Sequence, residues 1–398
     1  MKQIEHLDTL LLKSLLPYTV APRSTLIAIG GLSAYKKIGA LIDSGLIKEE
    51  SYESNKNKRH EFCSRKYLKL TKAGLRYLEK KSALPICIQK DEFSLLPKSY
   101  DIERLTHIQE VSSLMNAAGV QTECCKRKAL SFTKEIATLS DRPCLEELYK
   151  IQLQADESAL PSLYTRKEGD VYYNKGLIKS GNSINYSTHT HFLISDLYSF
   201  TVYHSGRDGV NFANGIVTND IVRRAILSDF GFSVKKDFRF PSPAIVICSS
   251  KSEFKKTFMS TTAKKKKARP SKIIHNPCFV IPSNEEGLLL LKAIVKLGYT
   301  THDILLKNLL LQTKYMGASV IKSLTIDFVI KNEVHLLAFD LNMPAILGFS
   351  KEATKDIGKR YVIHCTEKQK EFLSGIISQR ISFETDNLLK MLPSYLTK

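Results

Sequence analysis

The segment from Arg65 to Lys81, RKYLKLTKAGLRYLEKK, changes its hydrophobic period at one residue. Before Thr71, leucines alternate with lysines, which is typical of a half-buried strand, and after it the apolar residues recur at helical spacing. The Thr71 hydroxyl can accept a backbone N–H and so begin the helix. A basic strand joined directly to a basic helix predicts a hairpin arm followed by a helix that packs back on the same small core.

Three helical patterns and an extended arm come before this pair. The patterns cover residues 4–16, 23–29 and 32–43, and the arm begins at Ile47 and leads through a polar tip at 54–59. The helical patterns place their apolar residues on one face. The order helix, helix, helix, strand, basic loop, strand, helix resembles a winged helix-turn-helix domain.

In this resemblance the helix over 32–43 is the recognition helix and the tip at 54–59 is the wing. Such a helix can enter the major groove of DNA, and its exposed first turn favours anions. We expect Leu32 to lie on the buried face with Ile38 and Leu41. Basic side chains on the wing neutralise phosphates. The DNA-binding residues predicted in this domain are Ser33, Tyr35, Lys36, Lys37, Lys56, Lys58, Arg59 and Arg65. The alternative is a protein-interaction winged helix with a solvated basic face.

The charge balance indicates a polyanionic partner. The chain has 59 Lys and Arg against 40 Asp and Glu, a net charge of +19, and residues 1–85 hold 16 of the former and 8 of the latter. Such an excess favours nucleic acid, and less strongly an anionic membrane surface. Residues 251–272 carry nine further basic residues and one acid. This run is either a solvated linker or a second phosphate contact, for which the candidates are Lys264, Lys265, Lys266, Lys267 and Arg269.

The rest of the chain predicts a larger mixed domain. Residues 86–98 look like a linker, residues 99–282 form a β-rich α/β region, and residues 283–398 form a more helical α/β region packed with it. AIVICSSKSEFKKTF and RYVIHCTEKQKEFLSGII each contain a buried strand, a polar turn and a helix. Such units indicate a partly parallel sheet, and the two reflect either an internal duplication or convergence on one turn. The expected fold class is α/β, or α+β overall, with the winged helix at the N-terminus.

Three further stretches carry a resemblance to known proteins. A winged helix followed by a linker and the helix THIQEVSSLMNAAGV resembles the replication-relaxation family of plasmids and integrative elements. That resemblance implies an α/β domain related to restriction-type nucleases, and its core could be degenerate here. The stretches LYTRKEGDVYYNKGLIK and SINYSTHTHFLISDLYSFTVYHSGRDGVNF are similar to proteins of conjugative elements.

Two sets of residues are candidates for catalysis. His189 and His191 alternate on a predicted strand, so both imidazoles could face one metal ion, as in rolling-circle nucleases. Here threonine replaces the hydrophobic residue between the two histidines. Asp327 followed by Glu333 has approximately the layout of a restriction-type nuclease core, with His335 where a lysine would polarise the attacking water.

Other features narrow the function further. Asp340 ends a predicted strand, where it is either part of a ligand site or a helix cap. There is no Walker-type loop, G-x-G-x-x-G or G-x-S-x-G motif, so no nucleotide cofactor is expected. The eight cysteines form no C-x-x-C pair and indicate reduced thiols without a metal. No apolar run approaches the roughly 20 residues of a membrane span, so we expect a cytoplasmic protein without a membrane partner.

These observations predict a DNA-binding protein of a mobile genetic element. Its winged helix would bind a specific duplex site in replication initiation or conjugative transfer, a role that rests on the resemblance. Its expected partners are double-stranded DNA, a second copy of the chain, and replication or transfer proteins. The alternatives are a metal-dependent nuclease or relaxase and a dimeric transcription regulator.

Overall fold

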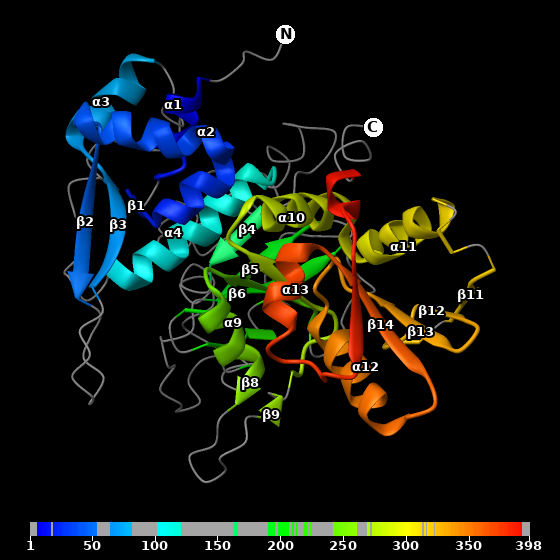
Figure 1. Ribbon diagram of the computed structural model, residues 1–398. Helices are drawn as coiled ribbons and strands as arrows, with labels where there is room; N and C mark the ends of the chain where they lie inside the picture. The colour runs from blue at the N-terminus through cyan, green and yellow to red at the C-terminus, as the bar shows by residue number, and fades with distance from the viewer. Residues whose placement is uncertain are drawn as a thin grey trace, which may run out of the picture. The chain divides into compact units, whose positions relative to one another are not determined.

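The chain divides into two compact units: residues 1–180 with 283–288, and residues 181–282 with 289–398. The computed structural model (Figure 1) describes residues 6–16, 19–53, 64–81, 102–120, 162–165, 190–195, 198–206, 209–210, 212, 219–220, 223, 242–260, 269–270, 273–312, 314–315, 317–321 and 323–391.

The first unit begins with helices and a small antiparallel sheet. Its strands lie in the order β1-β3-β2, and β3 pairs with both neighbours in the antiparallel sense. The elements are α1 (Leu7–Lys13), β1 (Val20–Ala21), α2 (Arg23–Asp43), β2 (Ile47–Glu53), β3 (Ser64–Leu70), α3 (Lys72–Lys80), α4 (Ile102–Ala117) and β4 (Ser162–Thr165).

Helix α2 consists of two helical parts. Gly31 interrupts it with φ 67° and ψ −163°, a backbone conformation that glycine adopts without a steric penalty. The two parts correspond to the separate helices that the sequence predicts. Leu26 of the first part and Ala34, Ile38 and Leu41 of the second are buried in one apolar core with α1 and the sheet.

The change of period at Thr71 is confirmed as a strand followed directly by a helix. The Thr71 hydroxyl accepts a hydrogen bond from Gly74 N at 3.1 Å and donates one to Gly45 O at 2.7 Å. A Cβ atom on Gly74 would lie 2.3 Å from Leu46 O, so glycine lets α3 pack closely against the turn before β2. The strand, cap and helix are thereby held to the core of the unit.

Helix α4 packs with α2 and β1 of the first unit. The Gln109 amide donates to Leu16 O at 2.6 Å and to Ser14 O at 3.0 Å, both at the end of α1. It lies with the N-terminal elements, and its polar residues Thr106, Gln109 and Glu110 are buried.

The second unit is a mixed α/β structure, as expected. Its described elements are β5 (Thr190–Ile194), β6 (Ser199–His204), β7 (Ala244–Cys248), α9 (Lys251–Phe258), β8 (Met259–Ser260), β9 (Arg269–Pro270), β10 (Cys278–Pro282), α10 (Glu285–Leu297, which spans the boundary), η3 (Gly298–Thr300), α11 (Thr301–Leu311), β11 (Ser319–Val320), β12 (Phe328–Ile330), β13 (Glu333–Leu337), α12 (Met343–Lys355), β14 (Arg360–Cys365), α13 (Glu367–Leu373), β15 (Ile381–Thr385) and η4 (Leu388–Met391).

One topology occurs twice among these strands. In one sheet β5 and β6 are antiparallel and β7 and β10 continue in parallel; in the other β12 and β13 are antiparallel and β14 and β15 continue in parallel. Both strand-to-helix turns carry a cap, since Ser250 and Thr366 accept from the backbone N–H three residues later. The repetition thus extends beyond the two strand-turn-helix units seen in the sequence.

The sheet β11-β12-β13-β14-β15 is covered on both faces. Alternate residues of β13 and β14 pack with α9, α12 and α13 in one core, while Phe328 and Leu337 pack with α11 and η4 in another. At the edge of this sheet, β15 runs parallel to β14. Asn284 accepts from Gly287 N at 2.9 Å and so caps the start of α10.

Candidate nucleic-acid interface

The second part of α2 presents an exposed face on the first unit. Leu32 and Tyr35 are 87% and 61% exposed, and Ser33 and Lys36 are also exposed, whereas Ala34 is buried. We expected Leu32 in the core, and that prediction is wrong. Because the chain turns at Gly31, the first turn of this part projects beyond the core that buries Ile38 and Leu41.

The same face continues along the helix through small side chains. Gly39 lies one turn after Tyr35 and two turns after Leu32, so its Cα is on their side of α2. A Cβ atom added at Gly39 would have no heavy atom within 4 Å, and Ala40 is exposed. The middle of this face therefore carries no long side chain, so a bulky partner can approach the helix backbone there.

Tyr35 is held by a cation from the start of α2. The Arg23 guanidinium lies over the Tyr35 ring, 4.9 Å from its centroid. Arg23 also lies 3.4 Å from Glu49, which lies 3.1 Å from the Lys66 ammonium. The hydrogen bond from Lys66 is the main reason that the pKa of Glu49 lies below its usual value. These contacts fix Arg23 and Tyr35 beside the β2–β3 sheet.

Lys36 and Lys37 have different surroundings. The Lys37 ammonium lies 2.9 Å from the Asp8 carboxylate of α1. Lys36 is exposed, and no charged partner is seen for it among the described residues. The two lysines are adjacent in the sequence, but only Lys37 has a carboxylate partner among the described residues.

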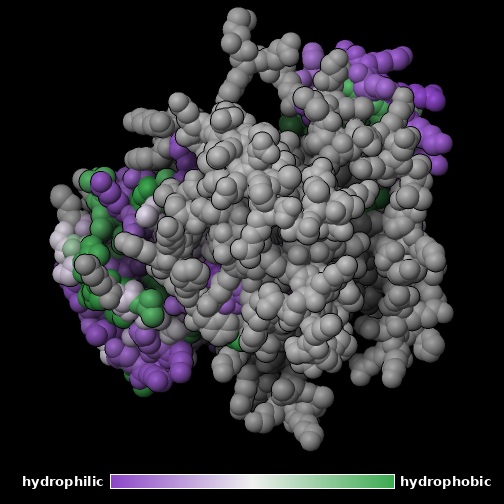
Figure 2. Space-filling model, turned by 180° about the vertical axis from the view of Figure 1, so that it is seen from behind, coloured by the Kyte–Doolittle hydropathy of each residue, from purple (hydrophilic) through white to green (hydrophobic). Residues whose placement is uncertain are grey.

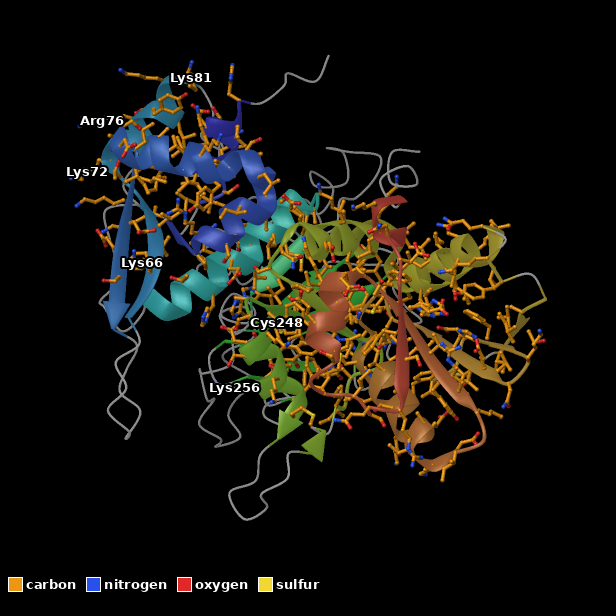
Figure 3. All side chains as sticks on the ribbon, in the orientation of Figure 1. Lys66, Lys72, Arg76, Lys81, Cys248 and Lys256 are labelled. Carbon is orange, nitrogen blue, oxygen red and sulfur yellow. The ribbon has the colours of Figure 1, made fainter. Side chains whose placement is uncertain are left out.

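Helix α3 carries a stripe of basic residues that are not among the predicted DNA-binding residues. Lys72, Arg76 and Lys80 are exposed and spaced four residues apart, so they lie on one side of the helix. Figure 3 shows Lys72, Arg76 and Lys81 projecting from α3, and Lys66 on β3. In Figure 2, hydrophilic side chains crowd the upper right, where this unit lies, with few hydrophobic ones between them. The i, i+4 spacing of these residues could have been noticed in the sequence.

Several predicted DNA-binding residues lie outside the described part of the chain. These are Lys56, Lys58, Arg59, Lys264, Lys265, Lys266 and Lys267. Arg65 lies on β3 opposite Tyr52, and Arg269 lies on β9 opposite Ser260. The structure thus places both arginines in strands.

The catalytic candidates are not brought together where the structure describes them. Asp327 accepts from Leu337 N at 2.6 Å, at the opposite end of β13 from Glu333 and about 13 Å away along the strand. Glu333 instead pairs with Arg360, 2.6 Å from its guanidinium. His191 is buried on β5, and His189 lies outside the described residues. This geometry gives Asp327 and Glu333 no shared site.

Asp327 belongs to a different cluster at the C-terminal end of β13. The His302 imidazole lies 2.8 Å from Asp327 and 3.0 Å from Asp340, and Asp340 is 1% exposed. Burial lowers the pKa of His302, but the charges and hydrogen bonds of Asp340 and Asp327 outweigh it and raise this pKa to about 11. The histidine is thus an imidazolium between two carboxylates, and Asp340 has a structural partner that the sequence did not reveal.

His335 belongs to a buried ring cluster. Its ring stacks on Phe328 at 4.7 Å and its Nδ1 lies 3.0 Å from His364 Nε2, while Tyr315 donates to Glu384 beside them. Burial lowers the pKa of both histidines, to about 4 for His364. Neutral histidines here do not supply the cation of a nuclease lysine.

Two properties of the described residues bear on other partners. No group of three or more His, Cys, Asp or Glu residues there is placed to hold a metal ion. Helix α2 is the one described helix that is long and apolar enough to cross a membrane. A core helix passes the same test, and the break at Gly31 divides α2 into two short parts, so this finding does not establish membrane association.

Comparisons of the chain with protein-family models, with curated proteins and with solved structures found no match.

Proposed function

We propose that the protein binds duplex DNA through an N-terminal winged helix. The observation that carries the proposal is the arrangement of the first unit: α1, β1, the two parts of α2, β2, β3 and α3, with the sheet order β1-β3-β2. This is the helix, strand, helix, helix, strand, strand order of a winged helix, and the hairpin β2–β3 is its wing. The second part of α2 is then the recognition helix.

The exposed face of α2 supports major-groove binding. The groove is about 12 Å wide and admits one helix, and residues 32–43 span about 18 Å. The open surface at Gly39 and Ala40 lets the helix backbone approach the bases closely. Ser33, Tyr35 and Lys36 can supply contacts to base edges and phosphates.

The basic side chains around this face would bind the phosphate backbone. Lys66 lies on the sheet and Lys72 and Arg76 lie on α3, and all three are exposed. Phosphate contacts of this kind position a protein on the duplex and make its affinity depend on salt. The predicted contacts on the wing and in the run 264–267 would add to the same effect.

The biological role we propose is replication initiation or conjugative transfer in a mobile element. It rests on the resemblance of the helix 106–120 and of the region 160–215 to proteins of such elements. A dimeric transcription regulator is the alternative that the same DNA-binding unit allows. A palindromic binding site would favour the regulator, and repeated direct sites would favour the initiator.

The test is selection of duplexes from a random pool by the full chain, followed by affinity measurements on the selected site. We expect enrichment of one sequence and an affinity that falls steeply with salt. If no duplex sequence is enriched and the affinity for DNA does not depend on salt, the proposal is contradicted.

A nuclease function in the second unit is the other candidate. The helix α11, the antiparallel strands β11 to β13, helix α12 and the parallel strand β14 give an order compatible with a restriction-type core. Asp327 and Glu333 do not share a site, however, so we propose that this core is a scaffold for DNA or protein partners. Cleavage of the selected duplex with Mg²⁺ or Mn²⁺, lost on Glu333→Ala, would overturn that proposal.

A further inference from the structure

We infer that Leu32 reads the methyl group of a thymine, so that the DNA site of this protein contains an A·T pair facing the start of the second part of α2. The inference rests on the proposed duplex-DNA function and adds a base preference to it. It starts from the exposed leucine at the beginning of this part of the helix.

Leu32 is the most exposed large hydrophobic side chain in the described part of the chain, at 87%. Exposure of an aliphatic side chain to water is unfavourable, and single exposed leucines are common on protein surfaces. This one occupies the first turn after Gly31, where a recognition helix meets base edges. Its exposure therefore coincides with the position that the proposed function assigns to sequence readout.

The chemistry of Leu32 restricts what it can recognise. An aliphatic side chain has no hydrogen-bonding group, and the base edges in the major groove otherwise present donors and acceptors. Thymine alone adds an apolar group there, its C5-methyl, and apolar side chains contact it. Leu32 can thus distinguish thymine from cytosine by apolar contact.

The surroundings of Leu32 would hold it against the base. Tyr35 lies about one turn away on the same side of the helix, and the Arg23 guanidinium 4.9 Å from its ring centroid fixes it there. Ser33 and Lys36 are exposed next to Leu32 and can contact polar base edges or phosphates. The patch is small and bordered by basic residues, which favours DNA over an apolar protein partner.

The experiment replaces each thymine of the selected duplex by uracil, one position at a time. Uracil differs from thymine only by the missing methyl group, so pairing is kept. We expect one position, on one strand, at which wild-type affinity falls about fourfold, the effect of one buried methyl-sized group. The Leu32→Ala variant should bind the thymine and uracil duplexes equally.

Leu324→Ala is the matched control, because Leu324 is 76% exposed in the second unit; it should keep the wild-type sensitivity to uracil. Circular dichroism checks that both variants are folded. If every uracil duplex binds like the parent, or if Leu32→Ala keeps the same loss, Leu32 does not read a thymine although DNA binding stands. If the chain selects no duplex at all, the proposed function fails and this inference fails with it.

Discussion

The Lys37 ammonium lies 2.9 Å from the Asp8 carboxylate, so this lysine joins the second part of α2 to α1, while its neighbour Lys36 is exposed. An exposed ion pair of this kind contributes less than about 1 kcal/mol to stability. The ion pair nevertheless keeps the Lys37 ammonium beside Asp8 in the free protein. The two lysines are therefore expected to contribute unequally to DNA binding.

We predict that Lys36→Ala weakens binding to the selected duplex more than Lys37→Ala does. Loss of a phosphate contact by Lys36 should reduce the slope of log affinity against log salt by about 0.9. Fluorescence anisotropy across a salt series measures both quantities. Equal effects of the two substitutions, or none from Lys36→Ala, would show that the helix is oriented differently on DNA.

Gly39 offers a substitution that separates folding from binding. Because a Cβ atom there would contact nothing, Gly39→Gln should raise the stability of α2 by up to about 1 kcal/mol, the penalty of glycine in a helix. The longer side chain should also hold the helix away from the groove and weaken binding at least tenfold. Thermal unfolding and anisotropy together check this. A variant that is more stable and binds DNA as before would exclude this face from the interface.

The basic stripe on α3 should bind DNA phosphates whatever the base sequence of the duplex. Replacing Lys72 and Arg76 together by alanine should weaken binding to selected and unrelated duplexes alike and lower the salt slope by about 1.8, for two lost contacts. The matched control is Lys351→Ala with Lys355→Ala on α12, a pair with the same spacing and exposure in the second unit. If the control pair has the larger effect, DNA contacts the second unit more closely than α3.

The His302 imidazolium should stabilise the second unit in a pH-dependent way. Its pKa is raised to about 11, so its contribution is complete below the unfolded value near 6.5 and is lost as the pH rises towards 11. His302→Gln should cost roughly 3–5 kcal/mol at pH 7, because it leaves buried carboxylates without a cation.

Urea unfolding at several pH values tests this contribution. The difference between wild type and His302→Gln should shrink from pH 7 to pH 10. Lys359→Gln, which removes an exposed ion pair with Asp356, should cost less than about 1 kcal/mol. A cost of His302→Gln that stays constant over this range would mean that the charge of the imidazole is not its source.

Local signals in the sequence predicted much of the fold. The period change at Thr71 and the strand, turn and helix of RYVIHCTEKQKEFLSGII each depend on neighbouring residues, and both are confirmed. Strand β15 has no such local signal, because its residues are held as a strand by pairing with β14. That pairing is a tertiary contact without a local signature.

In the candidate site, too, some features can be predicted from neighbouring residues and others depend on residues far away in the sequence. The polar face of α2 was visible in the sequence, but the exposure of Leu32 follows from the turn at Gly31, which the hydrophobic period of 32–43 does not reveal. His302 lies in an apolar helix, 25 and 38 residues from its two carboxylate partners. Neither spacing corresponds to a recognisable motif.

The most direct test of DNA binding by the first unit is the affinity of the full chain for its selected duplex and for a scrambled duplex of the same composition, measured over a salt series. We predict that the wild-type chain clearly prefers the selected duplex. In Lys36→Ala with Gly39→Gln this preference should be lost, and weak, salt-dependent binding to both duplexes should remain. A variant that still prefers the selected duplex would show that sequence recognition lies elsewhere in the chain.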